Sequence, residues 1–300
     1  MNALKRLQQR YPIGESRALY ELIMLRRFGL SRTDILLGKD TTLSADDKAE
    51  LQIIIDKVCK GEPVQYVLGS EEFCGREFLV CPDVLIPRPE TQELVRLVEQ
   101  NVAPGSKVLD IGTGSGCIAI TLALAGYCVS AIDVSEKALA VAQRNAQRLG
   151  AEVEFVREDI LAPSISPFGG VSKLQISSLP KHSPKGGAGR GLYCCIVSNP
   201  PYICESEASE MDENVLGHEP HLALFVPDND PLLFYRAIAD FGLEHLEGGG
   251  KIFFEANRAY TSQLCELLLQ KDYHNVQSFK DQYDNERFVV GSCCKALQHQ

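Results

Sequence analysis

The chain has no long apolar run: nowhere do its 300 residues approach the roughly 20 consecutive apolar side chains that cross a bilayer. Its first residues also lack the apolar core of a signal peptide, because Lys5, Arg6 and Arg10 stand among Leu and Gln there. A membrane-spanning or secreted protein is therefore disfavoured. We expect a cytoplasmic protein that does not bind a membrane.

Paired cysteines and excess basic charge are also missing. None of the eleven cysteines forms a C-x-x-C pair, and Cys194-Cys195 and Cys293-Cys294 lie in strand-like apolar runs. Reduced, mostly buried thiols are therefore expected rather than a disulfide framework or a zinc site. The 30 Lys and Arg against 40 Asp and Glu give a net charge of −10, which argues against binding nucleic acid mainly through its phosphates.

The overall composition is that of a globular protein, and the length allows one or two domains. Residues 1–70 show helical periodicity, and Ser44 followed by Asp47 is an acidic variant of the capping box that begins a helix. Apolar and aromatic residues around a turn predict a hairpin linker over 71–90. We expect residues 91–300 to form a second domain.

Short apolar strands alternate with helices in this second domain, which predicts an α/β fold with an open, Rossmann-like sheet. The last two strands have no helix between them and should pair as an antiparallel hairpin. A parallel sheet that ends in such a hairpin is typical of the seven-stranded S-adenosylmethionine-dependent methyltransferases. The expected strands are 107–110, 127–133, 152–156, 193–198, 251–256, 274–279 and 287–292.

An unusual segment, 163–192, interrupts this alternation between the third and fourth strands. Sixteen of its residues are Pro, Gly or Ser, four are Lys or Arg, and none is acidic. Such a composition does not form a packed core. The segment is predicted to be a flexible surface insertion, and a mobile basic flap over an active site is the alternative.

A glycine-rich segment, Asp110-Ile-Gly-Thr-Gly-Ser-Gly116, follows the first expected strand and precedes a helix. Glycines let backbone N–H groups approach a ligand closely near a helix N-terminus. The spacing differs from the dinucleotide fingerprint G-x-G-x-x-G, because Cys117 stands in place of its third glycine. This disfavours a nicotinamide dehydrogenase, and an unliganded turn is the other alternative. The candidate cofactor-binding residues are Gly112, Thr113, Gly114, Ser115 and Gly116.

Two acidic residues follow the next two strands. Asp133 ends the second strand, where a carboxylate can accept hydrogen bonds from both hydroxyls of a ribose. It could instead cap the following helix, although Ser135 competes for that place. Asp159 follows the third strand, where it either meets an adenine ring or merely ends the strand, and Ile160 would give the ring an apolar wall.

The sharpest motif is Asn199-Pro200-Pro201-Tyr202, at the end of the fourth strand. Successive prolines hold Asn199 and Pro200 extended, so that their carbonyl groups have fixed directions. The side-chain oxygen of Asn199 and the backbone oxygen of Pro200 are two acceptors suited to one planar NH₂ group. Tyr202 adds an aromatic face for the attached π-system. A rigid loop without a ligand is the alternative.

Together these motifs resemble the amino-group methyltransferases and, within them, the protein-(glutamine-N5) methyltransferases that modify peptide chain release factors. Asn-Pro-Pro-Tyr is shared with nucleic-acid adenine methyltransferases and does not discriminate. Specificity comes from the helical N-terminal domain and from the segments Pro87-Arg-Pro-Glu-Thr91, Glu219-Pro-His-Leu-Ala-Leu224 and Asp284-Asn-Glu-Arg287. Two departures are the long connection at 163–192 and Cys194-Cys195, which stands where the family often has an Asp.

The resemblance implies the fold, S-adenosylmethionine as cofactor, and methylation of the glutamine in the Gly-Gly-Gln loop of release factors. It implies that residues 1–70 recognise the substrate. It also assigns catalysis to Asn199, Pro200 and Tyr202. The same three residues and Pro201 are assigned to substrate binding, and Asn199 is assigned to cofactor binding in addition. Methylation of a glutamine in a ribosomal protein, methylation of adenine N6 in nucleic acid, and cofactor binding without catalysis are the alternatives. The acidic net charge disfavours a direct nucleic-acid substrate.

Overall fold

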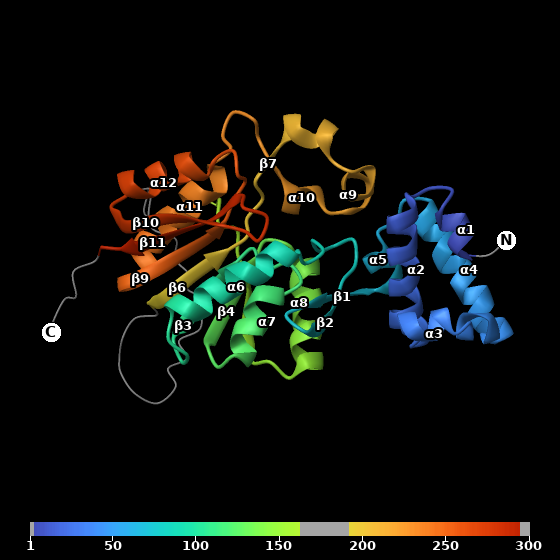
Figure 1. The fold of residues 1–300 in the computed structure, drawn as a ribbon. Coiled ribbons are helices and arrows are strands. Elements are labelled where there is room, and N and C mark those ends of the chain that lie inside the picture. The colour runs from blue at the N-terminus through green and yellow to red at the C-terminus, as the bar shows by residue number, and fades with distance from the viewer. Residues whose placement is uncertain (1–2, 163–191, 295–300) are drawn as a thin grey trace.

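The N-terminal part of the protein is a group of helices at one end of the molecule (Figure 1). The computed structural model describes residues 3–162 and 192–294. Ser44 accepts a hydrogen bond from the backbone N–H of Asp47, which confirms the predicted helix start. Leu7, Ile23 and Ile55 are fully buried in a core of these helices alone. The helices are α1 (Ala3–Leu7), α2 (Ile13–Phe28), α3 (Arg32–Leu36), α4 (Ala45–Cys59) and α5 (Val64–Leu68), with a 3₁₀ turn at Lys39–Thr42.

A β-hairpin connects these helices to the rest of the chain. Its strands are β1 (Ser70–Phe73) and β2 (Arg76–Leu79), which pair antiparallel. Residues 80–88 have no regular structure, and α6 (Pro89–Asn101) already begins inside the range expected for the linker. The reason is Pro89, whose fixed φ and missing N–H suit the first position of a helix.

A seven-stranded sheet forms the centre of the larger part, in the order β10-β11-β9-β6-β3-β4-β5. The predicted α/β class is confirmed. The β10–β11 hairpin is antiparallel, β11 is also antiparallel to β9, and the other neighbours are parallel. The strands are β3 (Lys107–Ile111), β4 (Cys128–Asp133), β5 (Val153–Arg157), β6 (Tyr193–Ser198), β9 (Leu246–Glu255), β10 (Tyr273–Lys280) and β11 (Glu286–Cys293).

The first residues of β9 were not predicted. The strand begins at Leu246, whereas the sequence predicted a start at residue 251. The prediction missed these residues because a run of three glycines interrupts the apolar pattern of the strand. A register shift between Tyr193 and Cys195 of β6 lets the neighbouring strands stay paired along this stretch. The insertion predicted over 163–192 lies outside the described residues except for Leu192.

Helices cover both faces of the sheet (Figure 1). Side chains of α6, α7 (Cys117–Leu124) and α8 (Glu136–Leu149) share one core with Val108, and side chains of α11 (Leu233–His245) and α12 (Thr261–Gln270) share the other with Leu109. These two β3 residues face opposite sides because successive side chains of a strand alternate. The inner strands β3 and β6 are therefore largely buried on both faces, whereas the edge strand β10 is mostly exposed.

Short elements lie beyond the carboxyl ends of the strands. They are β7 (Ile203–Cys204), a 3₁₀ turn at Glu205–Glu210, α9 (Glu213–His218), α10 (His221–Leu224) and β8 (Phe225–Val226). Strands β7 and β8 pair in parallel and tie this region together. Across residues 3–162 and 192–294, no helix has both the length and the apolar character needed to span a membrane.

Candidate active site

A pocket opens at the carboxyl ends of β3, β4 and β6, where the strand order reverses and open α/β sheets bind ligands. It holds about 890 Å³ of empty space, its open mouth included. Ile111, Asp133 and Asn199 line it from the three strand ends. The pocket therefore brings together candidate residues that lie far apart in the sequence.

The glycine loop forms part of the pocket wall with Gly112 and Gly114. Both have positive φ, +76° and +55°, and the N–H of Gly112 donates to the carbonyl of Ile132 at 2.9 Å, which fixes the loop to β4. A Cβ on either glycine would meet no protein atom within 4 Å. The open side of the loop is thus free for a close-fitting ligand.

The other three residues of this loop do not line the pocket and have contacts inside the protein. Thr113 donates to Asp110 at 2.7 Å, and the carbonyl of Ser115 accepts from Asn145 of α8 at 2.9 Å. A Cβ on Gly116 would lie 2.8 Å from Ile120. These residues hold β3, α7 and α8 together, and their direct contact with a cofactor stays a prediction.

Asp133 lies in the pocket wall beside the loop. Its Oδ2 accepts from the N–H of Gly114 at 2.9 Å and its Oδ1 from the N–H of Ser135 at 2.8 Å. Ser135, not Asp133, caps α8 by accepting from the N–H of Ala138. Burial raises the pKa of Asp133, although these N–H groups oppose the shift. Each carboxylate oxygen retains a lone pair for a ligand hydroxyl.

Asp159 and Ile160 line the same end of the pocket. The Oδ1 of Asp159 accepts from the N–H of Leu161 at 2.9 Å, which turns the chain after β5. Ile132 and Val134 add apolar surface beside Ile160. A carboxylate for a ribose, an open glycine loop and an apolar wall are the features that an adenosine needs, so these residues fit S-adenosylmethionine.

The Asn-Pro-Pro segment forms the other wall of the pocket. Ser198 donates to the carbonyl of Ile111 at 2.7 Å, so the end of β6 is anchored to β3. Asn199, Pro200 and Pro201 follow directly and line the pocket. The Nδ2 of Asn199 donates to the hydroxyl of Thr91 at 3.2 Å, which turns the amide nitrogen toward α6. The amide oxygen is the end that remains for a ligand.

Tyr202 does not line the pocket. Its ring packs against the core beside α11, and its hydroxyl donates to Glu255 at 3.3 Å. Burial is the main cause that raises the pKa of this phenol. The predicted stacking of Tyr202 on a substrate stays a prediction.

Sequence reasoning missed several residues of the site. Val84 and Leu85 reach the pocket from the linker, Leu222 from α10, and Phe234 from α11. Leu222 belongs to the segment 219–224, and Val84 and Leu85 lie near the segment 87–91, so family resemblance was their only signal. Phe234 lies near neither segment. No periodicity marks them as ligand contacts.

A partly buried ion pair connects those two segments. Glu219 is almost fully buried and accepts from Arg88 at 2.6 Å and from the N–H of Ile86 at 3.2 Å. Pro220 and Leu222 then follow at the pocket. The pair therefore fixes the linker against α10, which sets the distance between two sides of the pocket.

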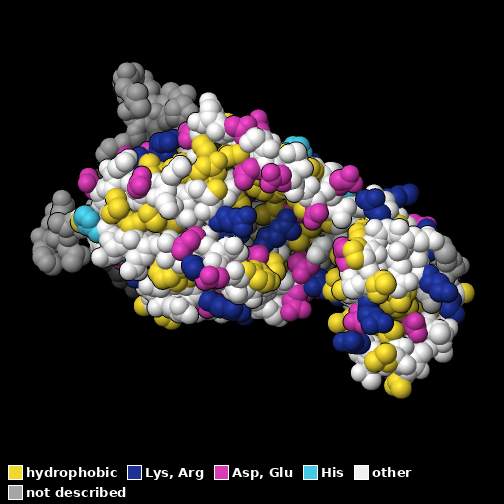
Figure 2. All heavy atoms as spheres, turned by 45° about the horizontal axis from the view of Figure 1, so that its top comes forward, with side chains coloured by type: hydrophobic (Ala, Val, Ile, Leu, Met, Phe, Trp, Pro, Cys, Tyr) yellow, Lys and Arg dark blue, Asp and Glu magenta, His cyan; other side chains and the backbone are white. Residues whose placement is uncertain are grey.

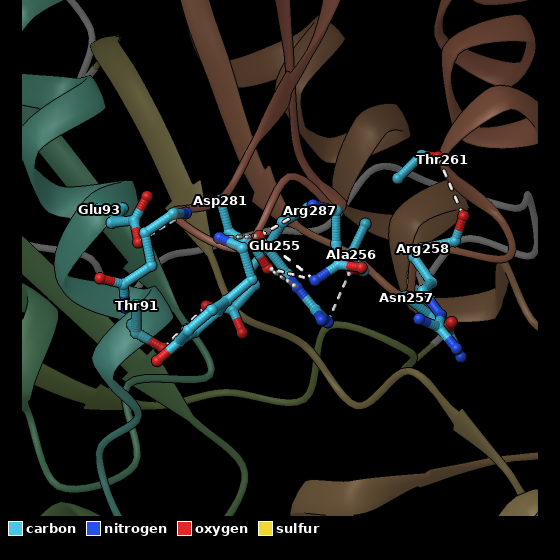
Figure 3. A network of polar contacts seen from close by, with 12 residues as sticks. Thr91, Glu93, Glu255, Ala256, Asn257, Arg258, Thr261, Asp281 and Arg287 are labelled. Carbon is cyan, nitrogen blue, oxygen red and sulfur yellow. Dashed lines mark hydrogen bonds and ion pairs between the residues drawn. The ribbon is translucent and has the colours of Figure 1, made fainter.

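A second buried group lies behind the Asn-Pro-Pro segment. Thr91 donates to Glu255 at 2.7 Å, and Figure 3 shows both with Arg287 and Asp281. Arg287 faces Asp281 at 3.5 Å and donates to the carbonyl of Ala256. Burial raises the pKa of Glu255 to about 7, although the bond from Thr91 and the charge of Arg287 lower it.

The sequence and the fold are similar to known methyltransferases. Residues 1–69 match a family model described as the PrmC N-terminal domain, and residues 108–172 match one described as a methyltransferase domain. A release factor glutamine methyltransferase of Bacteroides thetaiotaomicron is 45% identical over 95% of this chain and 96% of its own. A relative of the same name from Flavobacterium psychrophilum is 38% identical over 92% of this chain and 91% of the relative's own chain.

A solved structure gives the same result for the fold. The crystal structure of a methyltransferase from Pyrococcus furiosus aligns with a TM-score of 0.51 at 18% identity, covering 84% of this chain and 100% of that one. At this identity the likeness concerns the architecture alone.

Proposed function

Because the chain belongs to the release factor glutamine methyltransferases, we propose that it methylates the side-chain amide nitrogen, N5, of the glutamine in the Gly-Gly-Gln loop of peptide chain release factors. The observation that carries the proposal is a single pocket in which Asn199 and Pro200 lie across from Asp133 and the glycine loop. One wall suits a nucleoside, and the other suits a planar NH₂ group.

The cofactor is S-adenosylmethionine, which supplies an electrophilic methyl group. We assign its ribose to Asp133, its adenine to the wall of Asp159 and Ile160, and its remaining part to Gly112 and Gly114. The carboxylate accepts from hydroxyls as a charge-assisted partner, and the apolar wall excludes water from the ring. These residues bind and orient the cofactor.

An amide nitrogen is a poor nucleophile, because its lone pair is delocalised into the carbonyl group. The oxygens of Asn199 and Pro200 can accept from its two N–H bonds, hold it in line with the methyl group and stabilise the positive charge that develops. The new N–C bond forms as the C–S bond breaks. The methylated nitrogen then loses a proton to Asn199, Pro200 or water, so a dedicated general base is not needed.

The pocket mouth supports a substrate with little side-chain bulk before the glutamine. Leu85 from the linker and Leu222 from α10 line the pocket from two sides, and the Arg88–Glu219 pair fixes these segments against each other. Two glycines before the reactive residue let a backbone approach such walls closely.

We further propose that residues 1–70 recognise the release factor outside this loop, while 91–300 perform the transfer. The helical part has its own core and exposes Leu36 and Leu37 at its surface. Acidic and basic side chains are mixed over the face in Figure 2, which suits a protein surface better than a phosphate backbone.

The proposal is tested with Asn199→Ala. We expect turnover on a release factor to fall by orders of magnitude, about 10²-fold or more, because the lost acceptor acts mainly in the transition state. The affinity for S-adenosylmethionine should stay within a few-fold. Methyl transfer is measured by intact mass, and calorimetry gives the cofactor affinity.

The same assay tests the substrate. A release factor bearing Gly-Gly-Gln should gain one methyl group on that glutamine, and its Gln→Ala variant should gain none. Duplex DNA, structured RNA and ribosomal proteins are the competing acceptors. Transfer to one of these with the release factor unmodified would overturn the proposed substrate and leave the role of Asn199 to be judged on the new acceptor.

A further inference from the structure

A buried chain of hydrogen bonds extends from Asn199 away from the pocket. The Nδ2 of Asn199 donates to Thr91 at 3.2 Å, Thr91 donates to Oε2 of Glu255 at 2.7 Å, and Tyr202 donates to Oε1 of Glu255 at 3.3 Å. Thr91 and Glu255 are 3% and 1% exposed. Neither Thr91 nor Glu255 lines the pocket that the described residues form.

The direction of this chain is set at Glu255. An ionised carboxylate only accepts hydrogen bonds, so the hydroxyl hydrogen of Thr91 must point at Glu255. The Thr91 oxygen can then only accept from Asn199, and an amide accepts through oxygen and donates through nitrogen. The Asn199 nitrogen is therefore held at Thr91, and its oxygen is directed to the opposite side.

This direction matters because the two ends of an asparagine amide have nearly the same size. Packing alone hardly distinguishes the amide from its flipped form. A flipped Asn199 would present its NH₂ to the NH₂ of the substrate, so two donors would face each other and one acceptor would be lost. Only a hydrogen-bond partner of fixed polarity prevents the flip.

We propose that Thr91 and Glu255 are positioning residues that hold the Asn199 amide with its oxygen toward the substrate nitrogen. This inference rests on the proposed function and adds two residues that act on the reaction only through Asn199. Thr91 comes from the first turn of α6, Glu255 from the end of β9, and Asn199 from the end of β6. Three segments of the fold thus determine which amide atom meets the substrate.

Several groups face Glu255 and bear on its charge. Arg287 of β11 favours the carboxylate, and Glu90 of α6 disfavours it. Tyr202 and Thr91 donate to it, and the hydroxyl of Tyr235 donates to the backbone carbonyl of Glu255 rather than to its side chain. The positive charge of Arg287 acts on Asp281 as well as on Glu255. Protonated Glu255 could donate to Thr91, which would free the Thr91 hydrogen to turn toward Asn199.

A matched pair of substitutions at position 91 tests the proposal. Thr91→Val keeps the shape and removes the hydroxyl, whereas Thr91→Ser keeps the hydroxyl and removes the methyl group. We expect kcat on a release factor to fall about tenfold in Thr91→Val, as for the loss of one hydrogen bond, and to stay near the parent value in Thr91→Ser. The affinity for S-adenosylmethionine should be unchanged in both.

Different results would contradict the proposal. An unchanged kcat in Thr91→Val, or an equal loss in both variants, would show that the hydroxyl does not position Asn199. Failure of the parent protein to methylate a release factor would instead contradict the proposed function. These two failures are therefore distinguishable within one assay.

A pH profile tests the part played by Glu255 and does not depend on folding of Thr91→Val. The parent kcat should rise between about pH 6 and pH 8 as Glu255 ionises. Glu255→Gln can still accept from Thr91 through its amide oxygen but cannot titrate, so its profile should be flat there. Asp110 is a second group whose pKa is about 7. A rise that persists fully in Glu255→Gln would belong to such a group and would overturn the role of Glu255.

Discussion

We expect the affinity for the cofactor to depend on the side chain of Asp133. Its two oxygens already hold Gly114 and Ser135, and it lines the pocket where a ribose would lie. We expect Asp133→Ala to weaken binding of S-adenosylmethionine by about 1.5–3 kcal/mol, because hydrogen bonds to a charged group are lost. Calorimetry measures the effect directly.

An acidic residue three positions further on provides the control. Glu136 begins α8, its side chain is exposed, and it is not among the residues that line the pocket. Glu136→Ala removes the same charge and should leave the cofactor affinity unchanged. An equal loss in both variants would mean that general electrostatic attraction, not contact with the ribose, explains the effect of Asp133.

At the scale of secondary-structure elements, the junction between β3 and α7 requires glycine at position 116. Its φ is +82°, and a Cβ there would lie 2.8 Å from Ile120 and 3.0 Å from Ala142 of α8. We expect Gly116→Ala to lower the free energy of unfolding by about 1–2 kcal/mol for the backbone conformation and a further 1–3 kcal/mol for overpacking. Urea unfolding measures the sum.

Gly150 separates these two contributions. It follows α8 with φ +70°, but a Cβ there would meet nothing within 4 Å. Gly150→Ala should therefore show only the backbone part. Equal losses at both positions would show that α7 and α8 move apart readily, in which case the loop is not fixed by their packing.

The features that the sequence predicted follow from short motifs and from the general geometry of parallel strands. Ser44 caps its helix as expected, and Asp133 meets the glycine loop because the carboxyl ends of adjacent parallel strands lie together. The contact between Thr91 and Glu255 joins positions 164 residues apart, and no local pattern signals it. The bond from the hydroxyl of Tyr202 to the same buried carboxylate was likewise not predicted, and the stacking of its ring on a substrate stays a prediction.

For the whole molecule, a buried carboxyl in the inner strand β3 makes stability depend on pH. Asp110 is fully buried, and burial raises its pKa from 3.8 to about 7, against the hydrogen bonds from Thr113 and the N–H of Ala119. The folded state thus binds a proton more tightly than the unfolded chain does. The stability linked to Asp110 is complete below about pH 4 and is lost as the pH rises through about 7.

Asp110→Asn isolates this effect, because an amide does not titrate. Between about pH 5.5 and pH 7.5 the parent should lose about 1–2 kcal/mol of unfolding free energy relative to the variant. Glu255 adds a loss of the same sign in both proteins and cancels in the comparison. Parallel pH curves for the two proteins would show that Asp110 is ionised throughout this range.

The two walls of the pocket come from separate stretches of the chain. Residues 111–160 supply the wall assigned to the cofactor, residues 198–238 supply the wall assigned to the acceptor, and the linker contributes only from 83 to 85. Substitutions confined to the acceptor wall therefore change none of the side chains that we assign to the cofactor. Such a division favours evolutionary change, because descendants of one ancestral gene can acquire new methyl acceptors while inheriting the same methyl donor.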